Sequence, residues 1–210
     1  GSTGSGKSTL INLIPRYYDV TKGSVKVDGV DVRDMTQKEL RDKLGYVPQK
    51  GVLFSGTIDS NIRYGKPEIT DAQVKEAAEV AQATEFIDTK PEKYESPVSQ
   101  GGTNVSGGQK QRLSIARAIA KDPEIFIFDD SFSALDFKTD SQLRKALKEY
   151  TKDATTVIVA QRISTILGAD QIIVLDDGHM AGIGTHKELM ANCEVYQQIA
   201  RSQLSEEELA

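Results

Sequence analysis

The sequence predicts an α/β fold: a mainly parallel sheet with a small antiparallel β subdomain and an α-helical subdomain. A glycine-rich loop at the start of the chain runs into an apolar segment typical of a helix. Three short, continuous apolar runs follow further along, and such runs are typical of strands buried on both faces of a parallel sheet. Helical segments separate these runs, and this alternation favours an α/β core. The 210 residues leave room for one domain, and we expect residues 1–210 to form it.

Charge and hydropathy argue against two other classes of protein. The chain carries 26 Lys and Arg residues against 31 Asp and Glu, a formal charge of −5, whereas a nucleic-acid binder is expected to be basic. No stretch approaches the roughly 18 apolar residues that predict a membrane-spanning helix. The single cysteine, Cys193, cannot form an internal disulfide, and nothing near it has metal-ligand spacing. We expect a segment that works in a reducing, cytoplasmic compartment without nucleic acid.

The first residues match the phosphate-binding pattern G-x-x-x-x-G-K-[ST]. Glycines let consecutive backbone N–H groups turn inward around a phosphate, and the helix beginning near the lysine adds the positive end of its dipole. The residues predicted to line the phosphates are Gly1, Ser2, Thr3, Gly4, Ser5, Gly6, Lys7, Ser8 and Thr9. A flexible linker is the alternative, but the apolar helix predicted at Leu10–Ile14 disfavours it. A P-loop is normally oriented by the strand that precedes it, and this sequence has no such strand before Gly1. We therefore expect that strand on the N-terminal side of the loop, in a longer polypeptide.

The next elements are predicted from turn, cap and periodicity signals. Gly23–Val32 alternates apolar and polar residues around an Asp-Gly turn, which predicts an antiparallel hairpin. Leu44–Gln49 is predicted as a strand that ends in a polar residue. Residues 57–121 have helical periodicity and are predicted to form a helical subdomain. Thr70 and Gln73 form a capping-box pattern there. The apolar residues that share the face of the following helix are Val74, Ala77, Ala78 and Ala81.

The three apolar runs predict the strands of the core. They are Ile125–Phe128, Thr156–Ala160 and Ile172–Leu175. The first ends in Asp129 and Asp130, at the edge of the sheet where a phosphate-binding protein needs a carboxylate for Mg²⁺. The alternative is that these two aspartates cap the next helix. We expect the acidic end of the chain, from Ser205 on, to be solvated.

A second anion site is predicted at Val105–Gln109, where a serine and two glycines precede an apolar helix. With this motif, the chain resembles the nucleotide-binding domains of ATP-binding cassette (ABC) transporters over residues 1 to about 200. The family's motifs occur in order, and they are the P-loop, the Q-loop glutamine Gln49, the signature Val105–Gln109, the Walker B strand ending at Asp129, the D-loop Ser133–Asp136 and the switch segment Ala160–Arg162. Leu53–Ile58 and Gly184–Leu189 resemble the exporter branch.

The resemblance implies a P-loop NTPase core and a role for each motif. Lys7 and the loop backbone bind the phosphates of ATP, while Ser8, Gln49 and Asp129 bind Mg²⁺. Gln49 also contacts the attacking water and communicates with membrane helices. The resemblance also implies nucleotide-binding residues outside the P-loop, namely Ser106, Gly107, Gly108, Gln109 and Asp136. Among these, the signature residues would contact ATP held by a second subunit. The transmembrane domain and the aromatic residue that stacks on adenine are expected on the N-terminal side, with the domain at the cytoplasmic face of a membrane.

Two catalytic positions depart from the family pattern. Where the family has a glutamate after the Walker B aspartate and a histidine in the switch segment, this chain has Asp130 and Gln161. Asp130 is one methylene shorter, and a misplacement of about 1 Å can cost on the order of 10²-fold in rate. Gln161 can hydrogen-bond a phosphate but cannot shuttle a proton. One change is compatible with neutral drift; both together are typical of the degenerate half of a heterodimeric exporter.

Two further classes remain as alternatives. One is a nucleotide-gated regulatory or structural module that binds ATP with little turnover. The other is a DNA-repair or translation ATPase built on the same cassette, which the acidity of the chain and its lack of a long heptad segment disfavour. The two histidines, His179 and His186, lie far from the switch segment and are expected to be surface or turn residues.

Overall fold

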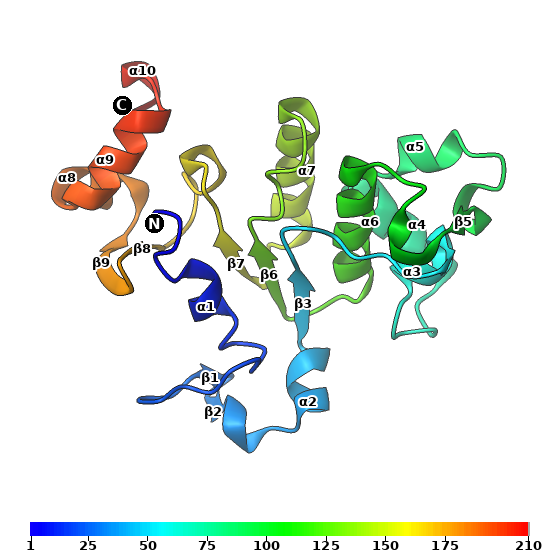
Figure 1. Cartoon of the computed structure of the whole chain (residues 1–210), viewed down its shortest axis with the longest axis horizontal. Coiled ribbons are helices and arrows are strands. Elements are labelled where there is room, and N and C mark those ends of the chain that lie inside the picture. Colours follow the sequence, from blue (N-terminus) through cyan, green and yellow to red (C-terminus); the bar gives the residue numbers. More distant parts are fainter. Residues whose placement is uncertain (210) are drawn as a thin grey trace. The chain divides into compact units, whose positions relative to one another are not determined.

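The structure is a computed structural model that describes residues 1–209 and divides into two compact units (Figure 1). We call the first the terminal unit; it consists of Gly1–Asp34 together with the chain from Ile158 onwards. The second, the central unit, is Met35–Val157. Each is described separately below. The predicted α/β class is confirmed, whereas the single domain and its helical subdomain over residues 57–121 stay predictions.

The N-terminal part of the terminal unit contains a short helix and a hairpin. Helix α1 (Lys7–Ile11) ends earlier than expected: the chain turns before Pro15, whose ring disfavours the helical conformation in the residue before it. Strands β1 (Lys26–Val27) and β2 (Val30–Asp31) pair antiparallel, as predicted. Between them, Asp28 and Gly29 have φ of 52° and 79°, which fits the tight turn that an Asp-Gly pair favours. A 3-10 turn, η1 (Val32–Asp34), follows.

The C-terminal part of the terminal unit corrects one prediction. Strand β8 (Ile172–Asp176) is not a buried parallel strand, because it pairs antiparallel with β9 (His179–Gly184). The connection is a second Asp-Gly turn, with Asp177 and Gly178 at φ of 46° and 77°. The side chains of β8 alternate between buried and exposed in its first three residues, as expected for a strand with one covered face.

Helices pack on the covered face of β8. They are η4 (Ile163–Thr165), α8 (His186–Asn192), α9 (Glu194–Gln203) and the short, exposed α10 (Glu206–Leu209). The buried cluster consists of Ile163, Ile172, Val174, Leu189, Cys193, Tyr196 and Ala200. Cys193 is a buried free thiol inside this core. His186 contacts the Tyr196 hydroxyl at 2.6 Å, and His179 is exposed on β9.

The central unit contains the parallel sheet. Strands β3 (Leu44–Val47) and β6 (Ile125–Asp129) pair in parallel, from Leu44 opposite Ile125 to Val47 opposite Phe128. Strand β7 (Thr155–Val159), which begins in the central unit and whose last two residues are counted with the terminal unit, follows helix α7 (Phe137–Tyr150) and completes the strand order β3-β6-β7. The middle of β6 is at most 2% exposed, as predicted. Thr155 and Thr156, at the start of β7, are exposed, and Val157 and Ile158 are half-buried, so the second apolar run is not buried on both faces.

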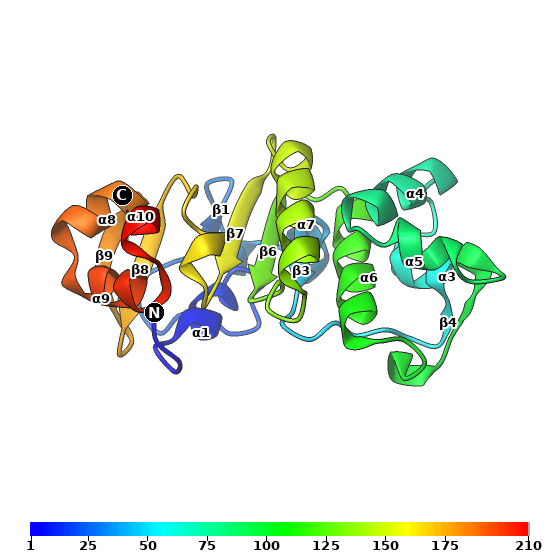
Figure 2. The same cartoon turned by 90° about the horizontal axis from the view of Figure 1, so that it is seen from above.

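Helices fill the rest of the central unit, around α6 (Gly107–Ala120) (Figure 2). The other helical elements are α2 (Gln37–Asp42), α3 (Ile58–Ile62), α4 (Asp71–Val80), α5 (Thr84–Asp88), η2 (Lys93–Glu95) and η3 (Gln100–Gly102), with one small antiparallel pair, β4 (Gly56–Thr57) and β5 (Pro97–Val98). The predicted capping box of α4 is present, with Thr70 accepting from the Gln73 N–H. The four apolar residues predicted on its inner face are at most 1% exposed.

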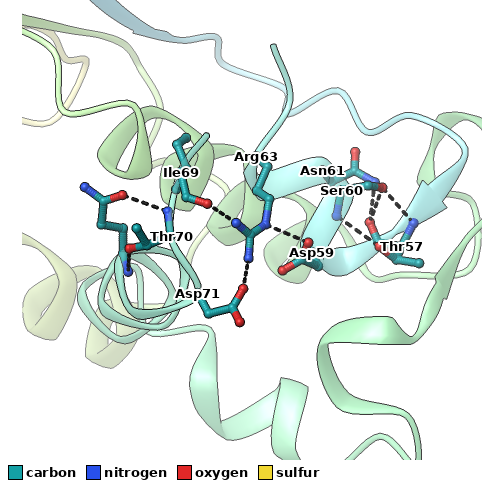
Figure 3. Close-up of polar contacts among 9 residues, drawn as sticks. Thr57, Asp59, Ser60, Asn61, Arg63, Ile69, Thr70 and Asp71 are labelled. Atoms are coloured by element: carbon teal, nitrogen blue, oxygen red, sulfur yellow. Dashed lines mark hydrogen bonds and ion pairs between the residues drawn. The ribbon is translucent and has the colours of Figure 1, made fainter. Parts of the chain in front are cut away.

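Arg63 holds the start of α4 against α3 (Figure 3). Its guanidinium donates to the Asp59 carboxylate at 2.8 Å, and also to the Asp71 carboxylate and the Ile69 carbonyl. Since Asp59 and Asp71 belong to two different helices, one planar donor fixes their relative position. No helix within residues 1–209 is long and apolar enough to cross a membrane.

Candidate functional site

The glycine-rich loop in the terminal unit wraps back toward its own lysine. Gly4 and Gly6 have φ of 78° and 100°, and Gly6 O accepts from Leu10 N to begin α1. A Cβ at Gly4 would meet no atom within 4 Å, so glycine is favoured there by backbone conformation rather than by space. The Lys7 ammonium donates to the carbonyls of Gly1 at 2.5 Å and Ser2 at 3.4 Å. The sequence therefore folds into a loop that holds a cation over its backbone.

Strand β8 and the β8–β9 turn of the terminal unit pack against this loop. Gly178, in the β8–β9 turn, donates its N–H to the Ser5 carbonyl at 3.0 Å. A Cβ atom at Gly1 would lie 2.4 Å from the carbonyl oxygen of Leu175, so close packing requires glycine at this position. The Ser5 hydroxyl is buried and has no hydrogen-bond partner among the described residues. A buried hydroxyl without a partner is unfavourable unless a ligand satisfies it.

These observations test whether the loop fits an anion. An ammonium, an unsatisfied hydroxyl and left-handed glycines are the groups that a phosphate-binding loop needs. The remaining polar members of the loop, Ser2, Thr3, Ser8 and Thr9, are exposed. Residues 1–209 contain no cluster of three or more His, Cys, Asp and Glu side chains that could hold a metal. The predicted Mg²⁺ ligands Ser8, Gln49 and Asp129 carry hydroxyl, amide and carboxylate oxygens, which are the donor atoms that Mg²⁺ prefers, and their role as ligands stays a prediction.

In the central unit, the end of β6 brings two predicted residues together. Asp129 is half-buried and accepts a hydrogen bond from the Tyr46 hydroxyl at 3.3 Å. Asp130 has a left-handed backbone with φ of 51°, a conformation that aspartate tolerates better than most residues. Its carboxylate accepts from the Gln49 side-chain amide at 3.1 Å. Gln49 and Asp130, both predicted catalytic residues, are therefore in contact although they are 81 positions apart in the sequence.

The alternative that Asp129 and Asp130 cap the next helix is wrong. That helix, α7, begins after Asp136, whose carboxylate accepts from the Thr139 N–H at 2.7 Å. The same hydrogen bond lowers the pKa of Asp136. Asp129 and Asp130 precede the connection to α7, so they remain at the end of the strand.

The predicted signature forms the first turn of α6. Ser106 accepts from the Gln109 N–H at 3.2 Å, and the Gln109 side chain accepts from the Ser106 N–H at 3.2 Å. In this capping box, the side chains of Ser106 and Gln109 are both hydrogen-bonded to backbone N–H groups of the motif itself. Cβ atoms built at Gly107 and Gly108 would meet nothing within 4 Å. The helix therefore presents an open, glycine-lined N-terminus, which is where an anion binds to a helix.

Gln161 lies in the terminal unit, directly after β7, and is exposed. Its backbone carbonyl accepts from the Gln203 side-chain amide at 2.8 Å, and the oxygen of that amide accepts from the Ile163 N–H at 2.8 Å. Gln203 was not predicted, because nothing in the sequence links the last residue of α9 to a segment 42 positions earlier.

Within each unit, the structure shows which of the predicted residues lie close together. In the central unit Gln49 and Asp130 are in contact, Asp129 lies beside them in the chain, and Ser106–Gln109 begin α6. In the terminal unit the P-loop is intact as a loop, and Gln161 is held by α9. The binding and catalytic roles of these residues stay predictions.

Comparisons with known proteins agree with this description. Residues 1–133 match the family model for ABC transporters. An uncharacterised ABC transporter ATP-binding protein of Mycobacterium tuberculosis is 50% identical over 206 residues, covering 97% of this chain and 35% of the relative. A putative multidrug export ATP-binding/permease protein of Staphylococcus aureus is 48% identical over 199 residues, covering 95% of this chain and 34% of the relative. The chain therefore spans about a third of the length of these curated relatives.

A solved structure gives the same result for the fold. A bacterial Atm1-family ABC exporter with ATP bound matches with a TM-score of 0.93 and 40% sequence identity. The match covers 98% of this chain and 36% of the exporter chain.

Proposed function

Because this chain belongs to the ABC transporter family, we propose that it is the ATP-binding and ATP-hydrolysing motor domain of an exporter, at the cytoplasmic face of a membrane. The observation that carries the proposal is the pairing of Gln49 with Asp130 at the end of a parallel strand, in a chain that also contains an intact phosphate-binding loop. The names of the Staphylococcus relative and the Atm1-family neighbour support export as the coupled process.

Phosphate binding is assigned to the terminal unit. The Lys7 ammonium, which now rests on two loop carbonyls, would turn to the β and γ phosphates. The hydroxyls of Ser5 and Ser8 and the loop N–H groups supply further donors. Mg²⁺ would be held by Ser8, Gln49 and Asp129, and when bound it neutralises charge on the phosphates.

Hydrolysis at this chain's own site is expected to be weak. Asp130 would orient the attacking water, but its carboxylate is one methylene shorter than glutamate. Its hydrogen bond with the Gln49 amide further fixes where that carboxylate can reach. Gln161 offers an amide where proton transfer would need an imidazole. Together these changes favour an ATP site that binds more than it hydrolyses.

The open N-terminus of α6 supports a role in a second site. Ser106, Gly107 and Gly108 would contact the γ-phosphate of ATP held by a partner nucleotide-binding domain. Since this chain lacks two catalytic groups and keeps the signature, the partner is proposed to be a non-identical subunit that supplies the missing groups. Asp136, the last residue of the D-loop Ser133–Asp136, is proposed to bind nucleotide on the basis of the family resemblance. The name ATP-binding/permease of the Staphylococcus relative supports a transmembrane domain as a further partner. Its proposed place before residue 1 rests on the resemblance to the exporter branch.

A nucleotide-gated module with little turnover is the second candidate. The short Asp130 and the neutral Gln161 favour it, because binding needs neither a longer carboxylate nor a proton shuttle. The two candidates differ in whether ATP hydrolysis by the complete complex depends on this chain.

The test is ATP turnover by the complete protein that contains this chain, assayed alone and then as the double variant Asp130→Glu, Gln161→His. We expect slow hydrolysis before the change and a gain on the order of 10²- to 10³-fold after it, equivalent to about 2.7 to 4 kcal/mol of transition-state stabilisation. Adding Asp129→Asn to the double variant should abolish the gain. Rapid hydrolysis by the unchanged homomeric protein would contradict the degenerate site.

A further inference from the structure

The buried side chain of Gln111 joins three segments of the central unit. It is 1% exposed and lies in the second turn of α6. Its Nε2 donates to the Pro48 carbonyl at 3.0 Å and to the Ser131 carbonyl at 2.8 Å. Its Oε1 accepts from the Gly51 N–H at 2.7 Å. One amide therefore satisfies three backbone groups from two separate loops.

These two loops carry the candidate catalytic groups. Gln49 lies between Pro48 and Gly51, and Asp130 is the residue before Ser131. The 3.1 Å contact between the Gln49 amide and the Asp130 carboxylate thus joins the same loops that Gln111 joins by their backbones. The buried Gln111 amide holds the backbones of both loops, so the placement of Gln49 and Asp130 depends on Gln111 as well as on their own hydrogen bond.

The packing around this junction leaves little room for movement. The Ser131 hydroxyl, which is fully buried, donates to the Val47 carbonyl at 2.7 Å. A Cβ at Gly51 would lie 2.9 Å from the Lys110 carbonyl and 3.1 Å from the Gln111 Oε1. Glycine at position 51 therefore lets the loop approach α6 closely enough for its N–H to reach Gln111.

We propose that Gln111 is a positioning residue that sets the placement of Gln49 relative to Asp130 and ties both to the helix that carries the signature. The expected effect of Gln111 on ATP hydrolysis rests on the proposed function. Its expected effect on the placement of the two loops rests on geometry alone. A neutral amide is suited to this task because it offers two donors and an acceptor without a buried charge. Ser106–Gly108 begin the same helix, so the Gln111 side chain would pass a shift of α6 to the loops of Gln49 and Asp130.

The first test measures amide hydrogen exchange in the nucleotide-free complete protein and needs no ATP. Gln111→Met keeps the length of the side chain but removes its three hydrogen bonds. We expect residues 47–53 and 129–133 to exchange on the order of 10-fold faster, since each lost hydrogen bond weakens local protection several-fold. Gly51→Ala is the second variant: it leaves Gln111 in place but pushes the loop away, and it should produce the same local change.

Asn61 provides the matched control. It is another buried amide of the central unit, 1% exposed. It also makes three hydrogen bonds to backbone groups: its Oδ1 accepts from Phe54 N at 2.8 Å, and its Nδ2 donates to Phe54 O and Thr57 O, both at 2.9 Å. Figure 3 shows Asn61 beside Thr57. Asn61→Leu should accelerate exchange in residues 54–61 and leave 129–133 unchanged. If Gln111→Met left exchange at 47–53 and 129–133 unchanged, or if Asn61→Leu altered 129–133 equally, the proposal would be wrong.

The second test separates binding from turnover. In Gln111→Met the single-turnover rate of ATP hydrolysis should fall on the order of 10-fold, with the Kd for ATP changed by less than about threefold, because the phosphate-binding loop is untouched. Equal losses in affinity and rate would overturn the positioning role. If the proposed function were wrong, the unchanged protein would neither bind nor hydrolyse ATP. The hydrogen-exchange experiment, which needs no ATP, would still test the structural role of Gln111.

Discussion

Single side chains at the candidate site are held in place by polar groups of their own unit. The Lys7 ammonium rests on the Gly1 and Ser2 carbonyls, and the Gln49 amide rests on Asp130. Contacts between charged or polar groups and a few carbonyls are weak enough to exchange for a stronger ligand. A phosphate that replaces two carbonyls as the partner of Lys7 gains a full charge–charge interaction.

The first prediction concerns that lysine. Lys7→Ala in the complete protein should weaken Mg-ATP binding at this site by about 10- to 100-fold, the loss expected for a charge-assisted hydrogen bond to phosphate. Direct titration with a labelled nucleotide measures it. Lys22→Ala, which removes an exposed lysine from the same unit, serves as the control and should leave the affinity unchanged. Equal affinity in both variants would mean that the loop does not bind the phosphates.

The second prediction concerns pH and the hairpin of the terminal unit. Arg33 donates to the Asp31 carboxylate at 2.7 and 3.0 Å, and its N–H donates at 2.9 Å; these bonds lower the pKa of Asp31 to about 2. A carboxylate with a depressed pKa stabilises the folded state above its unfolded value, about 3.9, and this stabilisation is lost as pH falls toward 2. Asp31→Asn should therefore lower the free energy of unfolding modestly at pH 5 and hardly at all near pH 2. Urea denaturation across this range decides it, and a constant difference at all pH values would contradict the assignment.

At the scale of elements, helix ends determine where the candidate loops lie. Capping boxes begin α4 and α6, and Asp136 caps α7. At the other end of the chain, the last residue of α9 holds the switch segment through the Gln203 amide. Helix α9 thus acts as the support on which Gln161 is presented.

The third prediction tests that support. Gln203→Leu removes both hydrogen bonds to the switch segment, each worth about 1 kcal/mol. We expect faster hydrogen exchange in residues 161–165 and a lower single-turnover rate of ATP hydrolysis, with nucleotide affinity nearly unchanged. The control is Gln197→Leu on the same helix, because the Gln197 amide donates to the Met190 carbonyl at 2.8 Å, outside the switch segment. If both variants behaved alike, α9 would have no specific role in holding Gln161.

At the scale of the whole molecule, the candidate groups are distributed over two units. The phosphate-binding loop and Gln161 belong to the terminal unit, while Gln49, Asp129, Asp130 and the signature belong to the central unit.

The fourth prediction places the signature in the partner's site. Gly108→Asp would put a carboxylate on the open face of the α6 N-terminus, where the γ-phosphate of the partner's ATP must approach. We expect ATPase activity of the mixed complex to fall by on the order of 10² or more, with ATP occupancy at Lys7 nearly normal.

Two further measurements complete this prediction. Adding Asp130→Glu to the Gly108→Asp chain should not restore activity, because the damaged site is the partner's. Photo-crosslinking of nucleotide to each subunit separates the two sites. Should Gly108→Asp empty this chain's own loop instead, the assignment to the partner would be wrong.

Much of the fold followed from local signals. The Asp28–Gly29 hairpin, the Thr70 cap and the buried strand ending at Asp129 were predicted correctly, because a turn, a helix cap and a continuous apolar run each act over a few residues. The P-loop is recognisable for the same reason: its glycines and lysine are adjacent in the chain.

The sequence by itself determined the order and identity of the motifs, the family and the parallel core. The tertiary structure decided which residues meet: that Gln49 reaches Asp130, that Gln111 holds the loops behind both, and that Gln203 holds the switch segment. It also decided that β8 pairs antiparallel, because an apolar run of four residues fits either kind of sheet until its partner strand is known. Hydrogen bonds between residues 20 to 81 positions apart depend on how elements pack, and no local pattern encodes that packing.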